Sequence, residues 1–142
     1  MTAAGASDGR DFLVGILLVV HNELGDCLVD CVRHVLGDVP HNLRVLPVFA
    51  VDDPQRKVAE GNTLIRQLDT GGGVLVLSDL FGATPSNIAR QLCETGRVMG
   101  VAGVNLPMLL RVVCYPNKSL EALAEIAVEG GRDSIVYLNP ET

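Results

Sequence analysis

Unbroken apolar runs alternate along this chain with segments in which apolar residues recur at helical spacing. The first run covers Phe12–Val20, and a shorter one covers Val74–Leu77. Strands that are buried on both faces lose the apolar/polar alternation of half-exposed strands, because neither face meets water. The pattern therefore predicts a mostly parallel β-sheet with helices on both faces, which is a three-layer α/β/α fold.

Glycine and proline mark the expected ends of these elements. We expect strands over Phe12–Val20, Arg44–Phe49, Val74–Ser78, Val98–Gly103 and Ser134–Leu138. We expect helices from 23 to 36, from 54 to 69, from 84 to 96, from 107 to 115 and from 120 to 130. Gly37 and the pair Gly130-Gly131 are typical helix stops, whereas Asp53-Pro54 and Thr84-Pro85 each offer an N-cap followed by proline at the first helical position.

The length of 142 residues suits one domain over residues 12–142, preceded by a flexible N-terminal tail over residues 1–11. We predict four parallel strands in the order 2-1-3-4 with a terminal fifth strand beside them. In open sheets of this kind, ligands bind beyond the carboxyl ends of the strands where the strand order reverses. The predicted order places that point between the first and third strands.

Charge and hydropathy exclude several classes of function. The net charge of −6 and the absence of Lys or Arg runs leave no electrostatic basis for binding nucleic acid. The longest apolar run, Phe12–Val20, is far shorter than the about 20 residues of a membrane-spanning helix. We therefore expect no nucleic-acid partner and no direct membrane insertion.

The cysteines and two of the histidines give no metal or redox signal. No pair among Cys27, Cys31, Cys93 and Cys114 has C-x-x-C spacing. We interpret them as buried, reduced thiols that act as small hydrophobic side chains, which fits a reducing cytoplasm. His34 and His41 are interpreted as surface histidines, since no ligand set surrounds either of them in the sequence. We expect no metal and no cofactor.

Candidate chemistry follows the first and third strands. His21 ends the first apolar run, and Asp79 leaves the third strand in the same manner. A histidine accepts a phosphoryl group through an unprotonated ring nitrogen, and a carboxylate on the other nitrogen fixes the tautomer and stabilises the developing charge. Taken alone, His21 is more often a strand-end histidine bonded to backbone, but the two positions together favour a catalytic pair.

The segment Leu80-Phe81-Gly82-Ala83-Thr84 supplies a candidate phosphate site. Gly82 and Ala83 allow a close backbone turn, and the amides at the start of the next helix point to the same region. The Thr84 hydroxyl is either an N-cap or a phosphate contact. Leu80 and Phe81 either form a docking surface for a partner protein or pack beneath the loop as a local plug.

Three stretches carry a resemblance to a known family. They are Gly15-Ile16-Leu17-Leu18-Val19-Val20-His21, the run from Gly73 to Asn87 that contains Asp79-Leu80-Phe81-Gly82-Ala83-Thr84-Pro85-Ser86-Asn87, and the run from Val101 to Met108. In order and spacing the chain resembles the mannose-family IIA component of the bacterial phosphotransferase system, over nearly its whole length.

The resemblance implies that His21 is phosphorylated, that Asp79 orients its ring, and that Thr84 with the preceding loop contacts the phosphoryl group. It implies transfer from the phosphocarrier protein HPr to His21 and onward to a IIB component, without nucleotide or metal, so that any membrane contact is indirect, through transporter components. It further implies a homodimer in which the last strand, either parallel or antiparallel, is exchanged between subunits.

Two other functions stay open at this stage. The chain is alternatively a non-catalytic regulatory module of the same fold, which binds a protein or a small anion. It is alternatively the phosphoryl donor subunit of a dihydroxyacetone kinase, which uses a similar domain.

Overall fold

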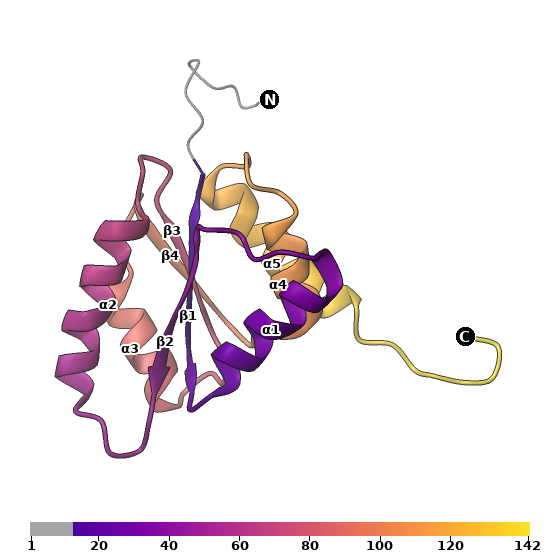
Figure 1. The fold of residues 1–142 in the computed structure, drawn as a ribbon, viewed down its shortest axis with the longest axis horizontal. Coiled ribbons are helices and arrows are strands. Elements are labelled where there is room, and N and C mark those ends of the chain that lie inside the picture. Colours follow the sequence, from indigo (N-terminus) through magenta and orange to yellow (C-terminus); the bar gives the residue numbers. More distant parts are fainter. Residues whose placement is uncertain (1–12) are drawn as a thin grey trace.

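The structure, a computed structural model, describes residues 13–142 and contains a four-stranded parallel sheet (Figure 1). The strands are β1 (Gly15–His21), β2 (Leu43–Val48), β3 (Val74–Ser78) and β4 (Val98–Ala102), and their order is β2-β1-β3-β4. The predicted order of the four parallel strands is confirmed. The predicted N-terminal tail, residues 1–11, lies outside the described residues.

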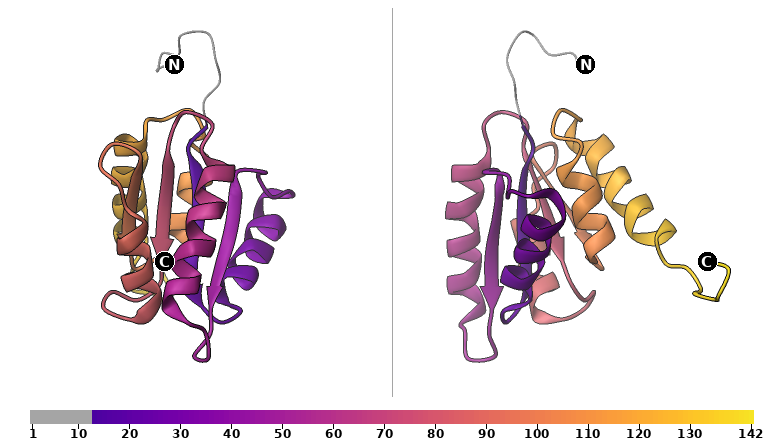
Figure 2. Two further views of the ribbon diagram at one scale, coloured as in Figure 1. Left: turned by 90° about the vertical axis from the view of Figure 1, so that its left-hand side faces the viewer. Right: turned by 45° about the vertical axis from the view of Figure 1, so that its right-hand side comes forward.

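Five helices cover the two faces of the sheet. They are α1 (Leu24–Leu36), α2 (Pro54–Leu68), α3 (Thr84–Leu92), α4 (Leu106–Val113) and α5 (Leu120–Asp133). Helices α2 and α3 lie on one face, and α1, α4 and α5 lie on the other (Figures 1 and 2). The three-layer α/β/α architecture is confirmed.

Each strand of the sheet interior contributes to two cores at once. Along β1, Ile16, Leu18 and Val20 belong to the core beneath α1, α4 and α5. Their neighbours Leu17 and Val19 belong to the core beneath α2 and α3. This burial on both faces explains the unbroken apolar run, because neither set of side chains meets water.

Two of the predicted helix signals act as expected. Gly37 ends α1 in the left-handed conformation, with φ of +87°, and its N–H donates to the carbonyl of Arg33. The side chain of Asp53 accepts a hydrogen bond from the N–H of Gln55 at the start of α2, and Pro54 is the first helical residue.

The prediction that Gly130-Gly131 ends the last helix is wrong. Both glycines are buried within α5, which continues to Asp133. A Cβ at Gly131 would lie 2.8 Å from Cε of Met108, and one at Gly130 would lie 3.0 Å from Cβ of Arg111. The missing side chains therefore allow α5 to pack closely against α4, and that packing outweighs the low helix propensity of glycine.

The predicted fifth strand over Ser134–Leu138 is absent from the sheet of this chain. Residues 135–138 follow α5 as an irregular segment, and the chain end extends away from the body of the molecule (Figure 1). Ile135, Val136, Tyr137 and Leu138 are all exposed. Their strand-like pattern has no partner strand within residues 13–142, so the apolar pattern alone does not make a strand.

The burial of the cysteines was also predicted wrongly. All four are free, and all four residues are exposed. In α1, Gly25 and Val32 are the buried positions, so Cys27 and Cys31 lie on the outer side of the apolar stripe. Among the described residues, no helix combines the length and apolar character needed to cross a membrane.

A polar clamp joins the loops at the amino ends of β3 and β4. One carboxylate oxygen of Asp69 accepts the N–H groups of Gly71 and Gly73, at 2.9 and 3.1 Å, and the other accepts from the guanidinium of Arg97 at 3.2 Å. Burial alone would raise the pKa of Asp69, but these donors outweigh it and lower the pKa below 3.8. The clamp therefore requires the carboxylate to be charged.

We predict that Asp69→Ala lowers the free energy of unfolding by about 1–3 kcal/mol at pH 7, because the N–H of the buried Gly73 loses its acceptor. The pKa of Asp69 is lower in the folded state than in the unfolded state, so its contribution is present above about pH 4 and declines as the pH falls further. Urea unfolding of the wild type and of Asp69→Ala from pH 7 to pH 3 measures the difference in unfolding free energy at each pH. Glu125→Ala removes an exposed helical carboxylate and serves as the control. An equal loss of unfolding free energy in Glu125→Ala would contradict the stabilising role of the Asp69 clamp.

Candidate functional site

The site lies at the carboxyl edge of the sheet, where β1 and β3 end side by side. His21 is the last residue of β1, and Asp79 directly follows β3. Residues of the two strands pair in parallel up to Val19 and Ser78, which brings the next side chains to one edge. Nδ1 of His21 lies 2.7 Å from Oδ2 of Asp79. The two residues singled out in the sequence are therefore in direct contact.

The same carboxylate oxygen also holds the backbone of the histidine. Oδ2 of Asp79 accepts the main-chain N–H of His21 at 3.1 Å. A carboxylate that accepts from both the backbone and the ring of one residue fixes the side-chain torsions as well as the ring orientation. The imidazole thus has one orientation set from two points.

This contact decides which ring nitrogen is available. A carboxylate on Nδ1 favours the neutral tautomer that carries its proton there and leaves the lone pair on Nε2. The side chain of His21 is 43% exposed, whereas that of Asp79 is only 12% exposed. Oδ1 of Asp79 is buried and makes no hydrogen bond within the described chain. The arrangement presents a nucleophilic nitrogen to solvent and keeps its carboxylate partner covered.

Asn22 turns the chain away from the sheet directly after the histidine, a role the sequence reasoning missed. It has φ of +51°, the one positive value for a residue other than glycine among residues 13–142, and its N–H donates to the carbonyl of Val48 in β2. Asparagine is one of the few side chains that tolerates this region. An Asn directly after a strand and before a helix was the available signal.

The loop that follows Asp79 is a tight turn. The N–H of Ala83 donates to the carbonyl of Leu80 at 3.2 Å, and the N–H of Gly82 donates to Oγ of Ser86 at 3.1 Å. Gly82 has φ of +88°, which favours glycine at this position. The amides of Leu80, Phe81 and Thr84 donate to no other described residue. Three backbone donors near the start of α3 are thus available to an anion.

Thr84 does not cap α3, contrary to one of its two predicted roles. Ala83 occupies the N-cap position, there is no side-chain cap, and Thr84 is already the first helical residue. Because Thr84 is exposed and lies inside the helix, its hydroxyl is not committed to the cap.

Leu80 and Phe81 do not pack beneath the loop. Their exposed fractions are 59% and 85%, so the interpretation as a local plug is wrong. His34 and His41 are exposed, as expected, in α1 and in the loop before β2. Across residues 13–142, no group of three or more His, Cys, Asp or Glu side chains could hold a metal ion.

Comparison with known proteins places this chain in a family. A sequence profile described as "PTS system fructose IIA component" matches residues 15–128. The chain belongs to this IIA family of the sugar phosphotransferase system. The predicted resemblance to the mannose-family IIA component is thereby confirmed, and its relatives are named as phosphotransferase-system proteins.

Two curated relatives illustrate the range of the IIA family. The mannose-specific EIIAB component of the phosphotransferase system of Escherichia coli K12 is 27% identical over 128 residues, which are 88% of this chain and 39% of that protein. The fructose-specific EIIA component of Bacillus subtilis is 28% identical over 102 residues, which are 71% of this chain and 69% of that protein. The chain thus spans about two fifths of the length of the E. coli relative.

Solved structures agree with the fold. The mannose/sorbose-specific IIA subunit of Enterococcus faecalis superposes with a TM-score of 0.80 at 22% identity, over 89% of this chain and 96% of that one. A IIA protein associated with the fucose utilization operon of Streptococcus pneumoniae superposes with a TM-score of 0.78 at 22% identity, over 89% and 94% of the two chains. At these identities the likeness to the solved structures shows the fold alone.

Proposed function

We propose that this IIA protein is a phosphoryl carrier that accepts the group from phosphorylated HPr on Nε2 of His21 and passes it to a IIB component. The observation that carries the proposal is the contact of 2.7 Å between Nδ1 of His21 and Oδ2 of Asp79, which leaves Nε2 exposed with its lone pair. In this proposal the exchange takes place in the cytoplasm and serves sugar uptake or its regulation.

The transfer step exchanges one P–N bond for another. The lone pair of Nε2 of His21 attacks the phosphorus of the donor phosphohistidine, and the electron pair of the breaking P–N bond returns to the donor ring nitrogen. When the donor ring is protonated on its other nitrogen, it leaves as neutral imidazole. His21 becomes a phosphorylated imidazolium whose Nδ1 proton stays on Asp79's side of the ring, where the carboxylate stabilises the positive charge. Transfer to IIB is the same step in reverse, and it uses no nucleotide or metal.

The turn after β3 is the proposed contact for the phosphoryl oxygens. The uncommitted amides of Leu80, Phe81 and Thr84 and the free hydroxyl of Thr84 lie at the start of α3, where the helix dipole favours an anion. Gly82 and Ala83 contribute by shaping the turn, since their own amides are already used within it. Positioning and charge stabilisation are what phosphoryl transfer between histidines requires.

The available lone pair distinguishes this role from one of the two alternatives, the regulatory module. A regulatory module that only binds a partner needs no exposed nitrogen with a fixed tautomer. A phosphoryl donor of a dihydroxyacetone kinase would use the same pair, but no feature of residues 13–142 selects that acceptor. The carrier role therefore accounts for the most structural detail.

We further propose that the protein is a homodimer in which residues 134–138 pair with a partner subunit. Four consecutive apolar residues are exposed in the single chain, which is costly in water, and β4 has a free edge in the sheet. We expect light scattering to give twice the mass of one chain, and the mass of one chain after removal of residues 135–142. A monomeric full-length protein would contradict the exchange.

We predict that incubation with phosphoenolpyruvate, enzyme I and HPr adds one phosphoryl group to the protein, and that His21→Ala abolishes the addition. Intact-mass spectrometry without acid, which preserves phosphohistidine, measures this. His34→Ala and His41→Ala are matched controls, because both side chains are exposed and distant from Asp79 in the sequence, and both variants are expected to label fully. Labelling of His21→Ala, or no labelling of wild type beside a working IIA protein, would contradict the proposal.

A further inference from the structure

The connection between β1 and α1 is short, and it starts directly at the histidine of the candidate site. β1 ends at His21 and α1 begins at Leu24, which leaves two residues between them. A link of this length has few backbone solutions, because steric clashes exclude most combinations of φ and ψ. Its conformation is therefore determined by how the strand end and the helix start are held.

On the strand side, hydrogen bonds in two directions hold the backbone around His21. The N–H of His21 donates to Oδ2 of Asp79, beyond the end of β3, at 3.1 Å. The N–H of Asn22 donates to the carbonyl of Val48, the last residue of β2, at 3.0 Å. His21 and Val48 are also partners in the register of β1 with β2. The peptide group between His21 and Asn22 is thus held as a continuation of the sheet.

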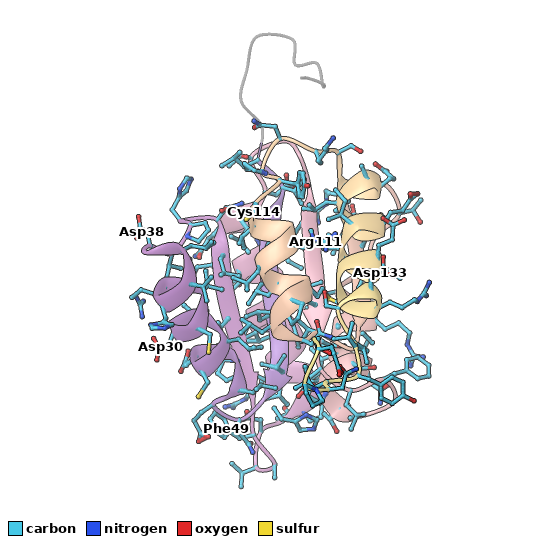
Figure 3. The ribbon with its side chains drawn as sticks, turned by 90° about the vertical axis from the view of Figure 1, so that its right-hand side faces the viewer. Asp30, Asp38, Phe49, Arg111, Cys114 and Asp133 are labelled. Atoms are coloured by element: carbon cyan, nitrogen blue, oxygen red, sulfur yellow. The ribbon has the colours of Figure 1, made fainter. Side chains whose placement is uncertain are left out.

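On the helix side, the first turn of α1 is packed tightly against the sheet at Gly25, which is buried. A Cβ at Gly25 would overlap Cγ1 of Val45 in β2 and would lie 3.1 Å from Cγ2 of Val20 in β1. Helix α1 begins at the end of the molecule that carries Phe49 and runs toward Asp38 at the opposite end (Figure 3). The start of the helix therefore cannot shift toward the sheet, and a shift away from it would open a gap beneath Gly25.

Between these two held ends, Asn22 adopts the left-handed conformation, with φ of +51°. This region is unfavourable for residues other than glycine, but asparagine tolerates it better than most, and β-branched side chains are strained there. Because α1 is held by its packing, a residue that returned φ to negative values would have to rotate the peptide group that it shares with His21. That rotation would break the hydrogen bond to Val48 and change the ψ angle of His21.

We infer that Asn22 is a positioning residue for phosphoryl transfer at His21. Its left-handed backbone keeps both the N–H and the ring of His21 on Oδ2 of Asp79, and so leaves Nε2 for the transfer. The inference rests on the proposed carrier function. The role belongs to the backbone of Asn22, so glycine, which adopts positive φ without strain, fulfils it equally well.

The test measures the rate of labelling and the tautomer of the His21 ring in variants of Asn22. We expect Asn22→Val to lower the saturated rate with phosphorylated HPr about tenfold or more and to leave KM unchanged, because a misplaced nucleophile slows the chemical step. Long-range ¹H–¹⁵N correlation is expected to show the proton on Nδ1 in wild type and in Asn22→Gly, and a shift toward the Nε2-protonated form in Asn22→Val. Asn22→Ala introduces a milder strain in the same direction and replaces Asn22→Val if that variant does not fold.

Gly37→Val is the matched control, because Gly37 lies at the other end of the same helix and has φ of +87°. A Cβ at Gly37 would meet nothing within 4 Å, so the variant adds backbone strain to α1 without a steric clash. We expect Gly37→Val to lower the free energy of unfolding but to retain the labelling rate and the ring tautomer. Equal effects of Gly37→Val and Asn22→Val on the ring would show that Asn22 acts through stability alone, which overturns the inference.

Three further outcomes are decisive. If Asn22→Gly labels as slowly as Asn22→Val, the carboxamide of Asn22 acts at the site and the backbone role is wrong. If Asn22→Val and Asn22→Ala keep the wild-type rate and tautomer, the ring does not depend on this turn, and the carrier function stands without the inference. If phosphorylated HPr does not label the wild type, the proposed donor is wrong. The ring measurement, which needs no phosphoryl donor, then decides by itself whether Asn22 positions His21.

Discussion

The geometry of the candidate site depends on the contact between Oδ2 of Asp79 and both the ring and the backbone of His21. Neither residue could hold this geometry from its own loop, because a strand end with free torsions does not fix a side chain. Parallel pairing of β1 with β3 places the two residues at one edge, and the shared carboxylate oxygen then sets the ring orientation. Nδ1 is occupied as a result, and Nε2 is the nitrogen that remains for the proposed phosphoryl transfer.

The rest of the molecule supports that contact from two sides. Strands β1 and β3 are buried on both faces by separate cores, so the position of the strand ends is determined by packing throughout the sheet. The amino edge is closed by the charged clamp of Asp69 and Arg97. The carboxyl edge carries short turns with uncommitted donors and exposed apolar residues instead. The charged clamp and the candidate site thus lie at opposite ends of the same sheet.

Much of this arrangement could be predicted from the sequence, because it follows from local patterns. Continuous apolar runs require burial on two faces, and chain order then brings His21 and Asp79 to one switch point. The sequence did not predict the role of Gly130 and Gly131, because their use is to let α5 approach Met108 and Arg111, which are distant in the chain. The exposure of Cys27 and Cys31 depends on the rotation of α1 over the sheet, which helical periodicity alone defines only loosely.

Two further features near the site could not be predicted from the local sequence pattern. The cap of α3 falls on Ala83 and not on Thr84, because helix boundaries shift by a residue or two from their sequence signals. The exposure of Phe49 and Val51 was not predicted either, because the loop after β2 is shaped by a hydrogen bond from the N–H of Phe49 to the carboxylate of Asp52 that the local sequence pattern does not indicate. The Ser134–Leu138 segment is the opposite case: its sequence has a clear strand pattern, but the segment forms no strand in the single chain.

The most direct test of the central contact is the tautomer of neutral His21, measured by long-range ¹H–¹⁵N NMR correlation on the imidazole ring. The contact predicts a proton on Nδ1 and a lone pair on Nε2 in the wild-type protein, and a shift toward the Nε2-protonated form that predominates in free histidine when Asp79 is replaced by Ala. Asp52→Ala serves as the control and is expected to leave the ring unchanged. A wild-type ring protonated on Nε2 would contradict the account, because the nitrogen assigned to phosphoryl transfer would then have no lone pair.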